Sequence, residues 1–293
     1  MTARQAGSRA LGLRRRLSER DMAVLASLEK LRLLTTSHVT RLHFTDGPTA
    51  SNIRRAQYTL KRLHQLKLVS RLSRVIGGKR AGSAGVVYGL SGLGLRVLFA
   101  PDTANQPRRR IWDTKPYFQD HMLKVADLYV GLIEREYHGI DLLSFDGEPT
   151  CWRHFTGPGG ELVVVKPDAY VQVGLDALVS SWFIEVDLGT ETLPTIQRKS
   201  ERYIAYWNSG TEQQRTQSEL DSGVFPFVLW LVPDAKRRDK FQQATCRLTP
   251  DARDLFKVAL LEDGVDALTR LPNHNAVSGS NQRQAGMLSR APP

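Results

Sequence analysis

The stretch KPDAYVQVGLDALVSSWFIEVDLGTE, residues 166–191, decides the fold of the C-terminal half. It holds two β-prone runs, 167–173 and 181–187, on either side of a turn signal that begins at Gly174 and ends at Asp176. Runs of this length around so short a turn pair with each other. We therefore expect an antiparallel β-hairpin.

The hairpin places carboxylates close together. Side chains alternate between the faces of a strand, so Glu185 and Asp187 share one face of the second strand. Asp168 lies on the first strand, on a face with Tyr170 and Gln172. The three acids, Asp168, Glu185 and Asp187, can thus converge across the hairpin.

The regions flanking the hairpin predict an α/β sandwich. After it, Thr192 can cap a helix that runs to about residue 207, with Lys199 two turns in and Tyr203 one turn further on the same face. Apolar periodicity predicts a helix over 118–137. Further strands are expected at 162–165, 224–232 and 255–260.

The N-terminal half has the pattern of a winged helix. Helices are expected from Ser18 to Leu34, over 37–44 and over 50–66, followed by strands at 68–72 and 86–90. The third helix has an apolar stripe of Ile53, Ala56, Leu60 and Leu63. Its remaining faces carry the predicted DNA-binding residues Arg54, Arg55, Tyr58, Lys61 and Arg62. The hairpin tip between the strands adds Lys79 and Arg80.

Charge supports a nucleic-acid partner for this half. The chain has 293 residues and a net charge of +11. Residues 1–110 hold 22 Lys and Arg against five acids, whereas residues 111–293 hold 19 against 25. A basic surface of this kind is the electrostatic footprint of a protein that binds nucleic acid. We expect duplex DNA as the partner; RNA is the alternative, although no aromatic stacking motif of single-strand binders is visible.

Composition bounds the compartment and the domains. No apolar run is long enough to cross a membrane, and Cys151 and Cys246 cannot form a disulfide framework. We expect a cytoplasmic protein with no membrane partner. The expected segments are a basic flexible tail (1–17), a winged-helix domain (18–100), a linker (101–112), an α/β domain (113–271) and a disordered tail (272–293).

The quoted motifs resemble a known family. KPDAYV, then FIEVDLGTE, then a helix with K-x-x-x-Y, are similar to the replication-relaxation family of plasmids and integrative elements. The resemblance covers roughly residues 18–262. It implies a winged helix joined to a domain like the PD-(D/E)XK nucleases, an α+β architecture, with Asp168 and Glu185 as the two motif acids. Asp187 stands where that pattern has lysine, and Lys199 would supply the missing ammonium.

The resemblance implies metal-dependent phosphodiester chemistry. Mg²⁺ or Mn²⁺ would be held by the hard carboxylate oxygens of Asp168, Glu185 and Asp187. Lys199 would orient the water or stabilise developing charge, and Glu191 and Tyr203 would lie at the rim.

Two functions remain open from the sequence. The first is a DNA endonuclease or nickase of plasmid or mobile-element DNA, which Asp168, Glu185 and Lys199 favour. The second is a catalytically inactive DNA-binding scaffold or transcriptional regulator, which Asp187 favours. Either could engage a replication or transfer protein. A homodimer is an alternative to a monomer, because many winged helices bind DNA as dimers.

Overall fold

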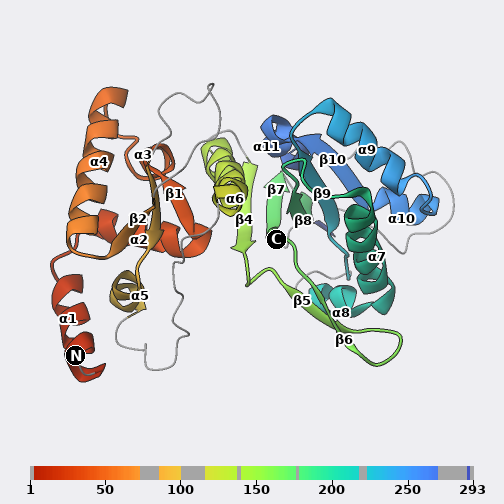
Figure 1. Cartoon of the computed structure of the whole chain (residues 1–293), viewed down its shortest axis with the longest axis horizontal. Helices are drawn as coiled ribbons and strands as arrows, with labels where there is room; N and C mark the ends of the chain where they lie inside the picture. Colours follow the sequence, from red (N-terminus) through yellow and green to blue (C-terminus); the bar gives the residue numbers. More distant parts are fainter. Residues whose placement is uncertain are drawn as a thin grey trace. The chain divides into compact units, whose positions relative to one another are not determined.

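A computed structural model describes residues 3–72, 86–99, 116–136, 140–175, 178–217, 223–269 and 289–290. The chain divides into two compact units, residues 1–130 and 131–293 (Figure 1). Helices and strands occur in both units, which confirms the α+β class. Within the described residues, no helix is long and apolar enough to cross a membrane.

The N-terminal unit combines helices with a small antiparallel sheet, whose strand order is β1-β3-β2. Its elements are α1 (Ala3–Arg14), α2 (Glu19–Leu31), β1 (Leu33–Thr35), α3 (Thr36–His43), α4 (Thr49–Gln65), β2 (Val69–Leu72), β3 (Val87–Leu90) and α5 (Gly92–Phe99). The predicted helices at 37–44 and 50–66 and the predicted strands at 68–72 and 86–90 therefore form within one or two residues of their expected bounds. The first predicted helix ends earlier, at Leu31.

Side-chain caps define the starts of α2 and α3. The Ser18 side chain accepts the N–H of Asp21, and the Asp21 carboxylate accepts the N–H of Ser18. Thr35 caps α3 in the same way, with His38 as the reciprocal partner. Each cap satisfies backbone donors that a helix start leaves unpaired. The caps explain why α3 begins directly after β1.

The apolar stripe of α4 is buried as predicted except at one position. Ala56, Leu60 and Leu63 are fully buried, whereas Ile53 is 39% exposed. Asn52 takes the inward position instead, and its Nδ2 donates to the carbonyl of Gly47 at 2.7 Å. The turn before α4 therefore needs an amide at the place where the apolar periodicity suggested isoleucine.

The N-terminal segment is helical, which corrects the prediction of a flexible tail over 1–17. Helix α1 packs against α5 and buries Ala10. The Arg14 guanidinium donates to the carbonyl of Leu98 at 2.9 Å, near the C-terminal end of α5. Alanine, leucine and arginine are strong helix formers, and a cation at a helix C-terminus is favourable.

Helix α6 (Pro116–Glu136) crosses the division between the units. Met122 and Leu123 pack with Leu33, Leu72 and Val87, so this part of α6 completes the core of the N-terminal unit. The division thus lies inside a helix that the sequence assigned to the C-terminal domain. The predicted linker, 101–112, falls outside the described residues, as does the predicted tail, 272–293, apart from 289–290.

The C-terminal unit is built on a mixed sheet with strand order β10-β9-β8-β7-β4, and β11 pairs with β8. Its strands are β4 (Ile140–Gly147), β7 (Ala169–Leu175), β8 (Leu178–Val186), β9 (Phe227–Val232), β10 (Phe256–Leu260) and β11 (Ser289–Arg290); β5 (Arg153–Thr156) and β6 (Leu162–Val165) form a separate hairpin. Its helices are α7 (Leu193–Ser209), α8 (Thr211–Gln217), α9 (Ala235–Thr245), α10 (Pro250–Asp254) and α11 (Gly264–Thr269), with a short 3-10 turn at Leu261–Asp263.

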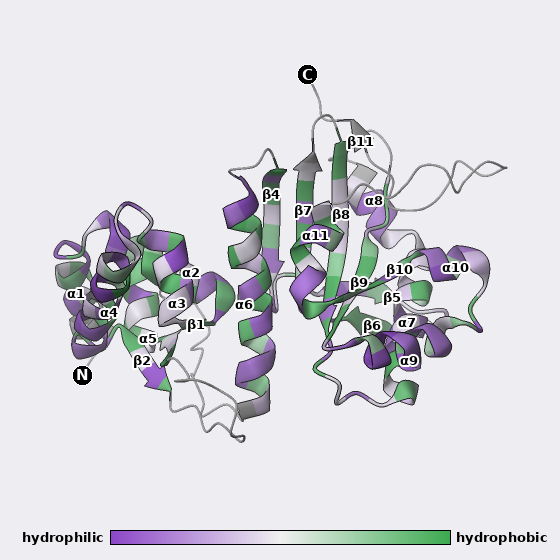
Figure 2. Cartoon of the chain, turned by 90° about the horizontal axis from the view of Figure 1, so that it is seen from above, coloured by the Kyte–Doolittle hydropathy of each residue, from purple (hydrophilic) through white to green (hydrophobic). Residues whose placement is uncertain are grey.

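The predicted hairpin is confirmed as β7 and β8, which are antiparallel with Ala169 opposite Ile184. Strands β8, β9 and β10 are parallel. Figure 2 shows hydrophobic colouring along β7, β8 and β9. Phe183, Tyr203 and Trp230 lie in the main buried cluster, where α7 and α9 meet the sheet. This core packs α7 and α9 against the strands of the sheet.

Candidate functional site

One face of α4 is basic and open to solvent. Arg54, Tyr58 and Lys61 are spaced by four and three residues, which places them on one side of the helix. All three are exposed, and the Tyr58 side chain is 70% exposed. Neither Arg54 nor Lys61 has an ion-pair partner among the described residues. These three residues form the outward-facing surface of the helix.

Arg55 turns to the other side, toward the loop before α4. Its guanidinium bonds both carboxylate oxygens of Asp46, at 2.7 and 3.2 Å, and lies 5.5 Å from the centre of the Phe44 ring. Arg20 shares both partners, at 3.2 Å from Asp46 and 5.0 Å from the ring centre. The hydrogen bonds from Arg55 hold the pKa of Asp46 well below its usual range. The sequence pattern missed this cluster because its members come from α2, α4 and the loop between α3 and α4.

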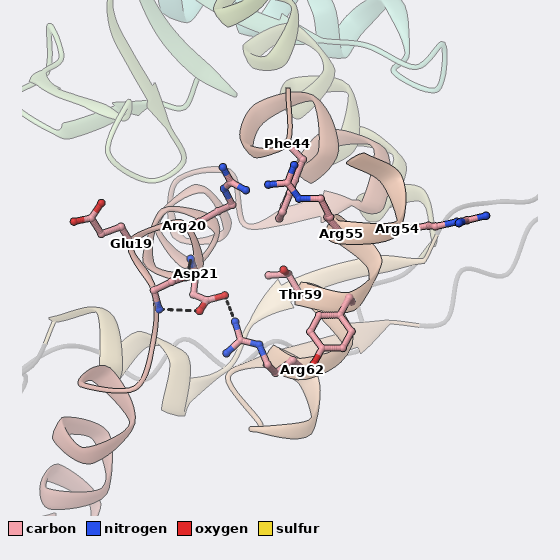
Figure 3. A pocket seen from close by; sticks show the side chains of 10 residues that line it. Glu19, Arg20, Asp21, Phe44, Arg54, Arg55, Thr59 and Arg62 are labelled. Atoms are coloured by element: carbon pink, nitrogen blue, oxygen red, sulfur yellow. Dashed lines mark hydrogen bonds and ion pairs between the residues drawn. The ribbon is translucent and has the colours of Figure 1, made fainter. Parts of the chain in front are cut away.

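Arg62 has a second role that its position in the sequence does not reveal. It pairs with Asp21, whose side chain is 1% exposed, and so ties α4 to α2 (Figure 3). Burial raises the pKa of Asp21, but the hydrogen bonds from Arg62 and the Ser18 backbone N–H lower it by more. The net pKa is below its usual value, so the group stays ionised. Lys79 and Arg80, expected at the hairpin tip, lie outside the described residues.

In the C-terminal unit, Asp168 is fixed at the start of β7. Its Oδ2 accepts the N–H of Val186 at 2.7 Å, and its own N–H donates to the carbonyl of Ile184. Both bonds cross to β8, on either side of Glu185. The predicted juxtaposition of Asp168 and Glu185 follows from this register.

Glu185 is buried and has partners on both oxygens. Its side chain is 2% exposed. Lys199 Nζ donates to Oε2 at 2.8 Å, and the Tyr203 hydroxyl donates to Oε1 at 2.7 Å. The two donors are one turn apart on α7, as the sequence spacing predicted.

The charge balance at Glu185 depends on Lys199. Burial raises the pKa of Glu185 to about 7; Lys199 opposes this rise and the nearby charge of Asp168 adds to it. Burial lowers the pKa of Lys199, but Glu185 and Glu191 raise it more strongly, and Glu191 Oε1 lies 2.6 Å from Nζ. Lys199 therefore remains an ammonium that compensates two carboxylates.

Asp187 belongs to a different ion pair. Its Oδ2 accepts the Nε–H of Arg237 at 2.5 Å, and its Oδ1 accepts the N–H of Gly189 at 2.8 Å. Arg237, in the first turn of α9, also donates to the backbone carbonyl of Glu191. No local pattern around Asp187 indicates Arg237, because the two residues are 50 positions apart and Arg237 lies on a different element.

The three acids do not form a metal site of the predicted kind. Both oxygens of Glu185 and both of Asp187 already accept hydrogen bonds from the protein, and Asp187 faces Arg237. In the described part of the chain, no group of three or more His, Cys, Asp or Glu side chains is placed to hold a metal ion. The donor set of Asp168, Glu185 and Asp187 therefore does not fit Mg²⁺ or Mn²⁺ as a three-carboxylate centre.

Comparison with known proteins identifies the family of the chain. Neither curated proteins nor solved structures give a match. The family model described as "Replication-relaxation" matches residues 25–219, which include α4, the β7–β8 hairpin and α7. This supports a role in plasmid or mobile-element replication or relaxation. The match spans more than half of the sequence and both compact units, and the chain belongs to the replication-relaxation family.

Proposed function

We propose that the chain binds double-stranded DNA through its N-terminal unit, acting as a winged helix on plasmid or mobile-element DNA. The observation that carries the proposal is the exposed face of Arg54, Tyr58 and Lys61 on α4. An α-helix with its side chains is about 10–12 Å wide, which fits a major groove about 12 Å wide. Arginine and lysine on that face can donate to phosphates or to guanine edges.

The experiment compares two pairs of charge removals in the full chain. The double variant Arg54→Ala with Lys61→Ala removes the two positive charges of the exposed face of α4. The double variant Lys240→Ala with Arg247→Ala removes two exposed positive charges from the C-terminal unit. We expect the first pair to weaken binding to a fluorescent duplex about tenfold or more, since a good base contact contributes about 1–3 kcal/mol. The second pair should bind within about twofold of wild type. Equal binding by both pairs would refute the assignment of α4.

The C-terminal unit then serves as a scaffold for DNA or for a replication or transfer protein. Its central acids are compensated inside the fold, Glu185 by Lys199 and Asp187 by Arg237. Both carboxylate oxygens of each acid accept hydrogen bonds from the protein, which favours a structural role for these acids. A homodimer is the alternative to a monomer, because many winged helices bind DNA as dimers, and sedimentation of the full chain distinguishes the two.

DNA cleavage is the second candidate, favoured by one observation. Asp168, Glu185 and Lys199 meet at one end of the β7–β8 hairpin, as the nuclease resemblance implied. Supercoiled plasmid incubated with the full chain and Mg²⁺ or Mn²⁺ tests it, with Asp168→Ala and Glu185→Ala beside the wild type. Nicking that both variants lose would support cleavage. Intact plasmid with all three proteins would leave DNA binding as the function of the chain.

A further inference from the structure

A pocket opens between α2 and α4 on the side of the N-terminal unit that carries Arg54 (Figure 3). Its volume is about 660 Å³. Four arginines line it, together with two acids and a few aromatic and hydroxyl side chains. The lining includes Arg20, Arg54, Arg55, Arg62, Tyr58 and Thr59.

The guanidinium groups are held in place before any ligand arrives. Asp46 fixes Arg20 and Arg55 side by side over Phe44, and Asp21 fixes Arg62 at the opposite wall. A guanidinium has five N–H donors, so pairing with one carboxylate leaves donors for a second anion. Pre-positioned donors lose little side-chain entropy when an anion binds.

The surroundings of these groups favour an anion over a base. The Phe44 ring has Arg20 and Arg55 against it and is 3% exposed, so it is not available for a nucleobase to stack on. Glu19 points away from the interior of the pocket, whereas Thr59 lies between the arginines with its hydroxyl on the pocket side (Figure 3). The lining therefore combines four guanidinium groups with neutral hydroxyl groups, and of its two acids Glu19 points away while Asp21 is already paired with Arg62.

We infer that this pocket takes one backbone phosphate of the duplex that α4 binds, with Arg20, Arg55, Arg62 and Thr59 as its donors. The inference rests on the proposed function. It assigns a DNA phosphate to the pocket that lies beside the exposed face of α4. Arg54 and Tyr58 belong both to the exposed face of α4 and to the pocket lining, so DNA on that face passes the pocket mouth. Phosphate contacts of this kind fix register without reading sequence.

Arg20→Gln in the full chain tests the inference cleanly. Asp46 keeps its bidentate partner Arg55 in this variant, so the loop before α4 stays neutralised. The matched control is Lys30→Gln, which removes the same charge from the exposed far end of α2. A second variant, Thr59→Val, removes a neutral donor and leaves every ion pair intact.

The measured quantity is duplex affinity across a salt series. We expect Arg20→Gln to weaken binding about threefold to tenfold and to reduce the slope of log K against log salt by about one, the contribution of one phosphate contact. Arg20→Lys should restore the slope, because it keeps the charge. Thr59→Val should weaken binding with an unchanged slope, and Lys30→Gln should match wild type.

The failures of the two proposals can be told apart. Suppose that Arg20→Gln and Thr59→Val both bind duplex as wild type does, whereas the double variant of Arg54 and Lys61 does not bind. This result overturns the phosphate assignment of the pocket and leaves the proposed function standing. A wild-type chain that binds no duplex overturns the proposed function and the pocket with it. The wild type could instead bind inorganic phosphate or a mononucleotide more tightly than it binds the duplex, and lose this binding in Arg20→Gln. That result would assign the pocket to a free anion and overturn its assignment to the DNA backbone.

Discussion

Adjacent arginines on α4 serve different purposes because of small differences in direction. Arg54 faces solvent, while Arg55 one position later reaches Asp46. Lys61 is exposed, and Arg62 covers the buried carboxylate of Asp21. A helix turns by about 100° per residue, so each neighbouring pair splits between an outer and an inner direction. The residues on the outer side face solvent, and those on the inner side pair with carboxylates of the fold and line the pocket between α2 and α4.

Arg62→Met should lower the stability of the protein. It leaves the Asp21 carboxylate, 1% exposed, without its cation, and we expect the free energy of unfolding to fall by about 2–3 kcal/mol. Urea unfolding of the full chain measures the loss. Arg54→Met is the control and should change stability by less than about 0.5 kcal/mol. Equal losses in the two variants would mean that the Arg62 ion pair does not stabilise the unit.

Glu185 should make stability depend on pH in a defined direction. Burial raises its folded-state pKa to about 7, above the unfolded value of 4.5. The folded state thus binds the proton more tightly, and this contribution to stability is complete below pH 4.5 and lost as pH rises through 7. Relative to Glu185→Gln, the wild type should gain stability between pH 8 and pH 5 in urea unfolding. A difference that stays constant with pH would contradict the raised pKa.

At the scale of elements, the close packing of α5 on the loop before β2 depends on one glycine. A Cβ at Gly94 would lie 2.2 Å from the backbone carbonyl oxygen of Leu68, whereas a Cβ at Gly92 would meet no atom within 4 Å. The backbone of α5 therefore approaches the loop at a distance that only glycine permits.

Gly94→Ala should destabilise the N-terminal unit, because the backbone must shift to admit the methyl group. We expect a loss of about 1–3 kcal/mol in thermal or urea unfolding. Gly92→Ala is the matched control in the same helix and should be neutral or slightly stabilising. The packing of α5 would be wrong if the two variants unfold alike.

Local signals in the sequence predicted most of these elements. Ser18 and Thr192 mark helix starts by their caps, and the alternation around Glu185 predicts β8 and its partner strand. Lys199 and Tyr203 could be predicted beside Glu185 because a helix repeats its face every four residues.

Contacts between distant segments could not be predicted. The residues around Asp187 do not predict Arg237 as its partner, and those around Arg62 do not predict Asp21. In both pairs the partner lies on another element. The prediction that assigned helix α6 to the C-terminal domain was incomplete for a related reason. Its apolar residues serve the core of the N-terminal unit through Met122 and Leu123, while Gly131 lies against Val265 in the C-terminal unit. A helix that is apolar on more than one side does not show from its sequence which core it completes.

At the scale of the whole molecule, the two halves of the chain carry opposite net charges. The excess of basic residues lies before residue 111, and the remainder of the chain is acidic. The acids of the C-terminal unit would repel a duplex at long range, while the N-terminal unit attracts it. The proposed DNA binding therefore belongs to the N-terminal unit, together with the part of α6 that completes its core.

The measurement that tests this account most directly is duplex binding by a fragment of residues 1–136, beside the full chain, over a salt series. The fragment keeps the core contributed by Met122 and Leu123. We predict a cooperatively folded fragment that binds within about threefold of the full chain and with the same salt slope, because the phosphate contacts are retained. A folded fragment that does not bind, beside a full chain that does, would contradict the account.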